Sequence, residues 1–112
     1  MIITLTSIQL RSVWKFFALT SNARKIQLQA KKSAGFVRMK NTGFGKLHYT
    51  LSIWESEAAL KAFSRSGAHL EAMKKSKDLA TELSTYTYET DEIPDWKAAK
   101  AMLAEKGTLL KF

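Results

Sequence analysis

The stretch KLHYTLSIWESEAALKAFSRSGAHLEAM, residues 46–73, decides how this chain folds. Apolar and mixed positions alternate over residues 47–54, and this period of two predicts a strand with one apolar face and one mixed face. Glu55 and Ser56 follow as an N-terminal cap with early negative charge, and good helix formers continue through Phe63. The stretch therefore predicts a strand that passes directly into a helix.

Five side chains of this stretch form the candidate site. His69 and Met73 are four residues apart, so in a helical turn they point the same way, towards the region that Trp54 and Phe63 also face. His48 shares the mixed face of the strand with Trp54. The alternative interpretation is purely structural, with His69 as a capped or interfacial histidine and Trp54 as a core aromatic.

The run IWESEAALKAF, followed by SGAH, resembles the dimeric α/β-barrel proteins of the antibiotic-biosynthesis monooxygenase type. The resemblance is best over residues 36–83. It implies a homodimer in which two sheets meet as a barrel, and a pocket between helices and sheet in each subunit. It also implies oxidation of a small aromatic or polyene substrate, with or without haem.

The resemblance suggests roles for the candidate residues. His69 is expected to be catalytic, as a proton shuttle or hydrogen-bond donor, and Trp54, Phe63, Met73 and His48 are expected to bind the substrate. Haem-degrading members carry an iron-binding histidine at the position aligned with Met73, so this chain departs from their pattern. The cofactor therefore stays open between none and haem.

The rest of the chain supplies the remaining elements of one domain, residues 1–112. We expect strands at 2–10, 36–40 and 81–89, a turn at 41–45, a helix at 13–32 capped by Ser12, and a closing helix that has Pro94 in its first turn and stops at Gly107. This order predicts an α+β fold, a ferredoxin-like βαββαβ unit with a four-stranded antiparallel sheet plus a C-terminal helix. Its helices would leave one sheet face open, to be buried against a second copy.

Composition excludes several chemistries. The 112 residues include no cysteine, which rules out disulfides, thiolate metal sites and cysteine nucleophiles. Two histidines without metal-ligand spacing predict no metal site. The N-terminus lacks the features of a signal peptide and no apolar run is long enough to span a bilayer, so we expect a cytoplasmic protein without a membrane partner.

The net charge of +8 is concentrated in the first half, where residues 1–50 hold nine Lys or Arg and no Asp or Glu. We interpret the basic stripe of the first helix as a solvated face; its members are Arg11, Lys15, Asn22, Lys25, Gln29 and Lys32. Three functions remain open: an oxygenase-type enzyme, a ligand-binding dimer without turnover, and a less favoured protein that binds nucleic acid or another polyanion through this basic half.

Overall fold

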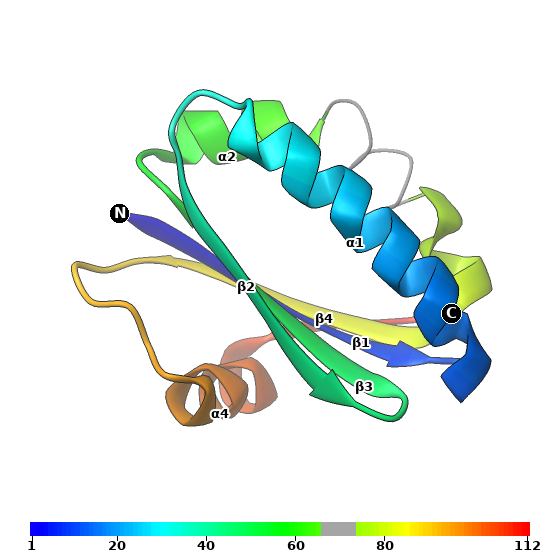
Figure 1. Cartoon of the computed structure of the whole chain (residues 1–112). Coiled ribbons are helices and arrows are strands. Elements are labelled where there is room, and N and C mark those ends of the chain that lie inside the picture. The colour runs from blue at the N-terminus through cyan, green and yellow to red at the C-terminus, as the bar shows by residue number, and fades with distance from the viewer. Residues whose placement is uncertain (66–73) are drawn as a thin grey trace.

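The computed structural model of the chain describes residues 1–65 and 74–112. Five strands form one antiparallel sheet in the order β2-β3-β1-β4-β5, with helices on both faces (Figure 1). The strands are β1 (Ile2–Leu10), β2 (Phe36–Phe44), β3 (Leu47–Trp54), β4 (Ala80–Glu89) and β5 (Thr108–Lys111). The helices are the 3₁₀ turn η1 (Val13–Lys15), α1 (Phe16–Lys31), α2 (Glu57–Ser64) and α4 (Trp96–Lys106), and residues 74–79 are also helical.

This architecture confirms the α+β, ferredoxin-like prediction but adds a strand. We expected four strands, whereas the residues after Gly107 form β5, which pairs with β4 from Thr85↔Thr108 to Glu82↔Lys111. The strand was missed because four residues are too few to establish a pattern of alternation. The expected end of β2 at Lys40 was also wrong, since pairing with β3 continues to Phe44↔Leu47 and the turn lies at Gly45 and Lys46.

The helix caps differ in part from those expected. Ser56 caps α2 as predicted, because its hydroxyl accepts a hydrogen bond from the Ala59 N–H at 3.1 Å. Ser12, in contrast, precedes η1 and makes no side-chain cap bond, and α1 begins only at Phe16. Asp95 caps α4 by accepting from the Ala98 N–H at 2.8 Å, so Pro94 lies before the helix and not in its first turn.

The expectation of an open sheet face was wrong, because α4 packs on it. Ala99 and Leu103 of α4 are buried against an apolar cluster from the two central strands, formed by Ile3, Leu5, Leu51 and Ile53. Partly buried rings surround this cluster, among them Tyr86 and Tyr88, which stack with ring centroids 5.4 Å apart. Burial raises the pKa of Tyr88, and the neighbouring charge of Tyr86 adds to the effect.

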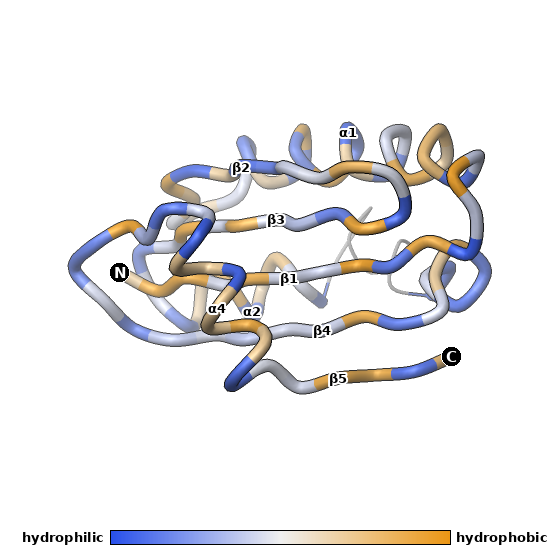
Figure 2. Tube along the Cα trace, turned by 90° about the horizontal axis from the view of Figure 1, so that it is seen from below, coloured by the Kyte–Doolittle hydropathy of each residue, from blue (hydrophilic) through white to orange (hydrophobic). Residues whose placement is uncertain are grey.

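The cover that α4 provides is incomplete. Seen from its side of the sheet, α4 lies over one end of the strands and leaves the end with the β2–β3 turn uncovered (Figure 2). Phe44 and Leu47 pair with each other beside this turn, and the register places them and Leu109 on the face of α4; the three side chains are 94%, 41% and 53% exposed. The opposite face of the sheet is covered by α1 and α2 (Figure 1). Among the described residues, no helix is both long and apolar enough to cross a membrane.

Candidate ligand-binding cavity

A cavity of about 480 Å³ lies between the sheet and the helices on the α1 side. Its volume is in the range of pockets that enclose small organic molecules. Three layers contribute to it: the mixed face of the sheet as a floor, the inner side of α1 as a roof, and α2 with the residues near Leu79 as walls. The cavity therefore lies between the sheet and the helices that cover this face.

The floor is a grid of hydroxyl groups, which the strand register places in two rows. In one row Ser52, Thr4 and Thr87 are paired across β3, β1 and β4; in the next row, Thr50, Thr6 and Thr85 are paired across the same strands. All six line the cavity. Because side chains two residues apart share a face, each strand contributes alternate positions and the grid is regular.

Some of these hydroxyls are already paired within the protein. The Thr4 and Thr87 hydroxyls are 3.0 Å apart, and the Thr50 hydroxyl donates to the Asn41 Oδ1 at 3.0 Å. Within the described part of the chain, the hydroxyls of Thr6, Ser52 and Thr85 have no hydrogen-bond partner. These three groups can donate to, or accept from, a neutral oxygen of a bound molecule.

The roof and walls are mainly apolar. The inner side of α1 contributes Leu19, Ala23 and Ile26, which are four and three residues apart and so lie on one side of the helix. Leu60 and Phe63 of α2 and the buried Leu79 close the sides. A ligand that fits this cavity thus needs a largely apolar body with polar atoms along one side.

Trp54 and Phe63 lie together at one end of the cavity. Phe63 lines it directly, whereas Trp54 is completely buried behind Phe63, with the two ring centroids 4.8 Å apart. Phe36 makes a second ring contact with Trp54, at 5.4 Å. The Trp54 Nε1–H is buried without a hydrogen-bond partner among the described residues. Trp54 therefore supports the end wall from behind.

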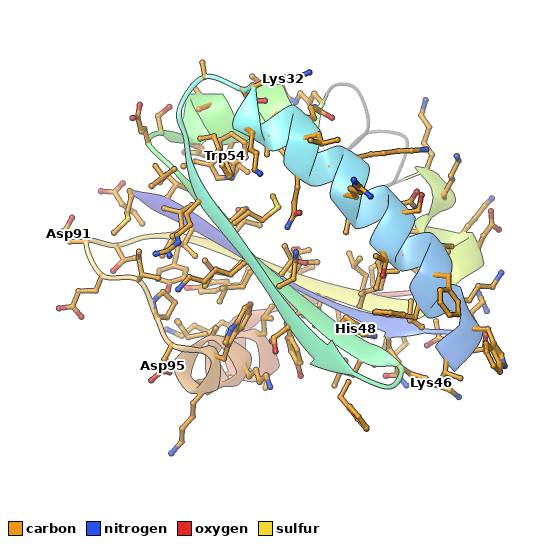
Figure 3. The ribbon with its side chains drawn as sticks, viewed as in Figure 1. Lys32, Lys46, His48, Trp54, Asp91 and Asp95 are labelled. Atoms are coloured by element: carbon orange, nitrogen blue, oxygen red, sulfur yellow. The ribbon has the colours of Figure 1, made fainter. Side chains whose placement is uncertain are left out.

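His48 lies at the other end of β3 (Figure 3). Its ring stacks on Phe16 at the start of α1, with centroids 5.3 Å apart, and its Nε2 is 2.9 Å from the Gly45 carbonyl oxygen. Trp54 and His48 share one face of the strand, but they are six positions apart. The structure therefore does not bring His48 together with Trp54 and Phe63, and neither His48 nor Trp54 is among the residues that line the cavity.

His69 and Met73, the remaining two candidates, lie outside the described residues. Among the described residues that line the cavity, Ser64 is the last before the segment 66–73 and Ser76 is the first after it. The chain thus borders the cavity both before and after residues 66–73.

The described lining carries little charge. Glu57 and Lys61 lie at its edge and pair with each other at 3.2 Å, with side chains more than half exposed. No group of three or more acidic, histidine or cysteine side chains that could hold a metal occurs among residues 1–65 and 74–112. The described lining also offers no imidazole for haem iron and no unpaired cation for haem carboxylates, so these residues do not fit haem.

The hydroxyl grid was missed in the sequence, although a signal for it exists. Thr4 and Thr6, and likewise Thr85 and Thr87, alternate with larger apolar or aromatic residues in β1 and β4. This alternation marks one face of each strand as hydroxyl-rich. The register of β3, β1 and β4 then places the hydroxyl-rich faces of the three strands side by side as one surface.

Several solved structures share the fold of this chain. A protein of Nitrosomonas europaea, which carries the provisional name antibiotic biosynthesis monooxygenase, superposes with a TM-score of 0.73 at 14% identity over 82% of this chain and 100% of its own. SnoaB from Streptomyces nogalater, a cofactor-independent oxygenase, has a TM-score of 0.68 at 12% identity over 84% and 97%. The fold is that of the antibiotic-biosynthesis monooxygenase-like dimeric α/β-barrel proteins.

A third such structure, Rv0793 from Mycobacterium tuberculosis, has a TM-score of 0.74 at 12% identity and covers 84% of this chain and 98% of its own. At the level of sequence, the family model "Domain of unknown function (DUF3291)" matches residues 11–107. The chain therefore belongs to the DUF3291 family. No curated protein matches the sequence.

Proposed function

We propose that this protein is a homodimeric, monooxygenase-type enzyme that oxidises a small hydrophobic substrate, aromatic or polyene, inside the cavity. The observation that carries the proposal is the cavity itself: about 480 Å³ with an apolar roof, an aromatic end wall and a floor of hydroxyls. The fold shared with a cofactor-independent oxygenase is consistent with this class of reaction.

The proposal includes an orientation for the substrate. The apolar body of the substrate would lie under Leu19, Ala23 and Ile26, and Phe63 would bound it at one end. Hydroxyl or carbonyl oxygens on the other side would bind Thr6, Ser52 and Thr85, which have no protein partner among the described residues. Because these groups are neutral, we expect neutral substrates to bind better than carboxylates or phosphates.

In the proposed chemistry, His69 removes a proton from the substrate. A histidine can take up a proton near neutral pH, and the resulting electron-rich substrate carbanion would then react with dioxygen. One oxygen atom would become a carbonyl oxygen of the product and the other would leave as water, with the hydrogens that the substrate carbon loses. The substrate itself can supply the electrons, so this route needs no cofactor. Because the described lining does not fit haem, we derive no step through haem.

The uncovered half of the sheet supports the proposed homodimer. The strand register places the exposed Phe44, Leu47 and Leu109 on the same face on which α4 packs. Large exposed apolar groups on a small domain favour burial against another copy. The partner would then meet the sheet beside α4, and the dimer would not form over the whole face.

A ligand-binding dimer without turnover is the second candidate. One observation favours it: the described lining contains no titratable group except the exposed Glu57–Lys61 pair. In our proposal catalysis depends on His69, whereas binding does not.

The variant His69→Ala separates the two candidates. The assay is oxygen uptake with a panel of neutral, hydroxylated polycyclic aromatic compounds, together with binding of the same compounds by tryptophan fluorescence quenching. The enzyme proposal expects oxygen uptake that falls roughly a hundredfold or more in the variant, the usual scale for loss of a general base. Binding without oxygen uptake would favour the second candidate, and an unchanged rate would remove His69 from the mechanism.

A further inference from the structure

The outer side of α1 combines exposed aromatic and aliphatic side chains with cations. Trp14 and Phe17 are 76% and 68% exposed, and Leu28 is 53% exposed. Phe17 and Leu28 share one side of α1 with Arg24 and Lys31, because these four positions are three, four or seven residues apart; Trp14 precedes them in η1. We call this side, with its flanking cations Arg11, Lys15, Lys25 and Lys32, the outer α1 surface.

The outer α1 surface carries positive charge without compensation. The first acidic residue of the chain is Glu55, so η1, α1 and β2 contain none. None of the α1 cations forms an ion pair with a carboxylate in the part of the chain that the structure describes. Asp91 and Asp95 lie near α4, on the other side of the molecule from α1 (Figure 3). Neither these two carboxylates nor any acidic residue of η1, α1 or β2 offsets the charge of the outer α1 surface.

We propose that the outer α1 surface docks on an anionic membrane surface. A helix with Trp, Phe and Leu among Lys and Arg is typical of segments that lie in the plane of a lipid interface. There the apolar side chains enter the boundary of the acyl chains while the cations meet anionic headgroups. This docking needs no spanning segment, and it revises our expectation from the sequence that the protein has no membrane partner.

The composition of the surface favours lipid over other anionic or apolar partners. A nucleic acid would stack its bases on aromatic rings, but Leu28 and the 49% exposed Val13 have no ring. The hydrocarbon of a membrane can accommodate these two side chains as well as Trp14 and Phe17. A second copy of the chain would bring two uncompensated basic helices together, which like-charge repulsion opposes. An anionic bilayer satisfies both the charge and the apolar groups.

Docking on this side would also place the cavity close to the membrane. The inner side of α1 forms the cavity roof through Leu19, Ala23 and Ile26, so one helix separates the lipid from the cavity. A hydrophobic molecule dissolved in the bilayer would then be near its binding site. The docking itself rests on the outer surface alone and holds whether or not the cavity is catalytic.

The test is co-sedimentation of the full chain with vesicles of phosphatidylcholine alone or mixed with phosphatidylserine. We expect binding to the mixed vesicles that weakens as salt is raised, and little binding to phosphatidylcholine. The double variant Arg24→Gln/Lys31→Gln should bind about 30-fold more weakly, because each cation near an anionic surface contributes about a fivefold factor. The matched control Lys97→Gln/Lys106→Gln has the same net charge but changes exposed residues of α4, and it should bind like the wild type.

Tryptophan fluorescence is a second readout, because it reports whether Trp14 enters the lipid. Mixed vesicles should shift the tryptophan emission to the blue. Trp14→Phe should abolish the shift, because Trp54 is completely buried and Trp96 lies on α4, against the opposite face of the sheet. Trp14→Ala should weaken binding roughly tenfold. Equal binding to both kinds of vesicle, or equal loss in the α4 control, would overturn the proposal. Salt-sensitive binding to an oligonucleotide without vesicle binding would replace the membrane by nucleic acid, and self-association that Trp14→Ala abolishes would replace it by a second copy.

Discussion

Replacing Phe63 by Ala tests whether the end wall of the cavity is part of the core. Phe63 is 4% exposed and packs on the completely buried Trp54, with ring centroids 4.8 Å apart. Truncating a buried Phe to Ala typically costs 3–5 kcal/mol, and the contact between two rings contributes about 0.5–1.5 kcal/mol beyond its buried area. One side of Phe63 borders the cavity and so has fewer contacts to lose. We therefore expect a loss of about 3 kcal/mol, at the lower end of that range.

Urea denaturation followed by circular dichroism measures this loss. For a domain of this size, about 3 kcal/mol corresponds to a fall of roughly 10–20 °C in Tm, which a thermal scan checks independently. The control is Phe17→Ala, which removes the same atoms from a ring that is 68% exposed. This control should change the free energy of unfolding by no more than about 0.5 kcal/mol.

Two results would refute the reasoning about Phe63. If Phe63→Ala and Phe17→Ala lowered stability equally, the Trp54–Phe63 contact would not be a core contact. If Phe63→Ala left the free energy of unfolding within about 1 kcal/mol of the wild type, Phe63 would not be tightly packed in the core. The end wall could then not determine which ligand shapes fit the cavity.

Three further predictions concern the floor, the assembly and the α4 side. In urea denaturation, Thr87→Val should lower the free energy of unfolding by about 0.5–1 kcal/mol because it removes the hydrogen bond to Thr4. Thr6→Val should change this free energy by less than about 0.5 kcal/mol. A larger loss for Thr6→Val than for Thr87→Val would contradict the hydrogen bonding described for the cavity floor. Sedimentation at micromolar concentration should give a mass near twice 12.6 kDa, and a monomeric mass would exclude the homodimer. The pKa of Tyr88 is raised above 10.0 in the folded protein, so its contribution to stability is present below pH 10 and is lost as the pH rises through the folded-state pKa. Urea denaturation at each pH should therefore show a smaller loss of stability in that range for Tyr88→Phe than for the wild type.

The sequence alone determined most of the fold, because the signals that define it are local. Alternation over β3 and the three- to four-residue spacing of Leu19, Ala23 and Ile26 each depend on the geometry of a single element, so they can be read without knowing its neighbours. The cap at Ser56 is local in the same sense. The order of the elements then restricted the topology to the ferredoxin-like arrangement.

Tertiary structure decided how these elements are combined into a site. Pairing in register brought hydroxyls from β1, β3 and β4 into one floor, and no single strand reveals that alignment. Contacts between elements also determine that α4 packs on the sheet face that was expected to be open. They likewise determine that Trp54 lies behind Phe63 and that His48 lies apart from both. These outcomes depend on which surfaces bury the most apolar area together, and that competition is settled only when the whole chain packs.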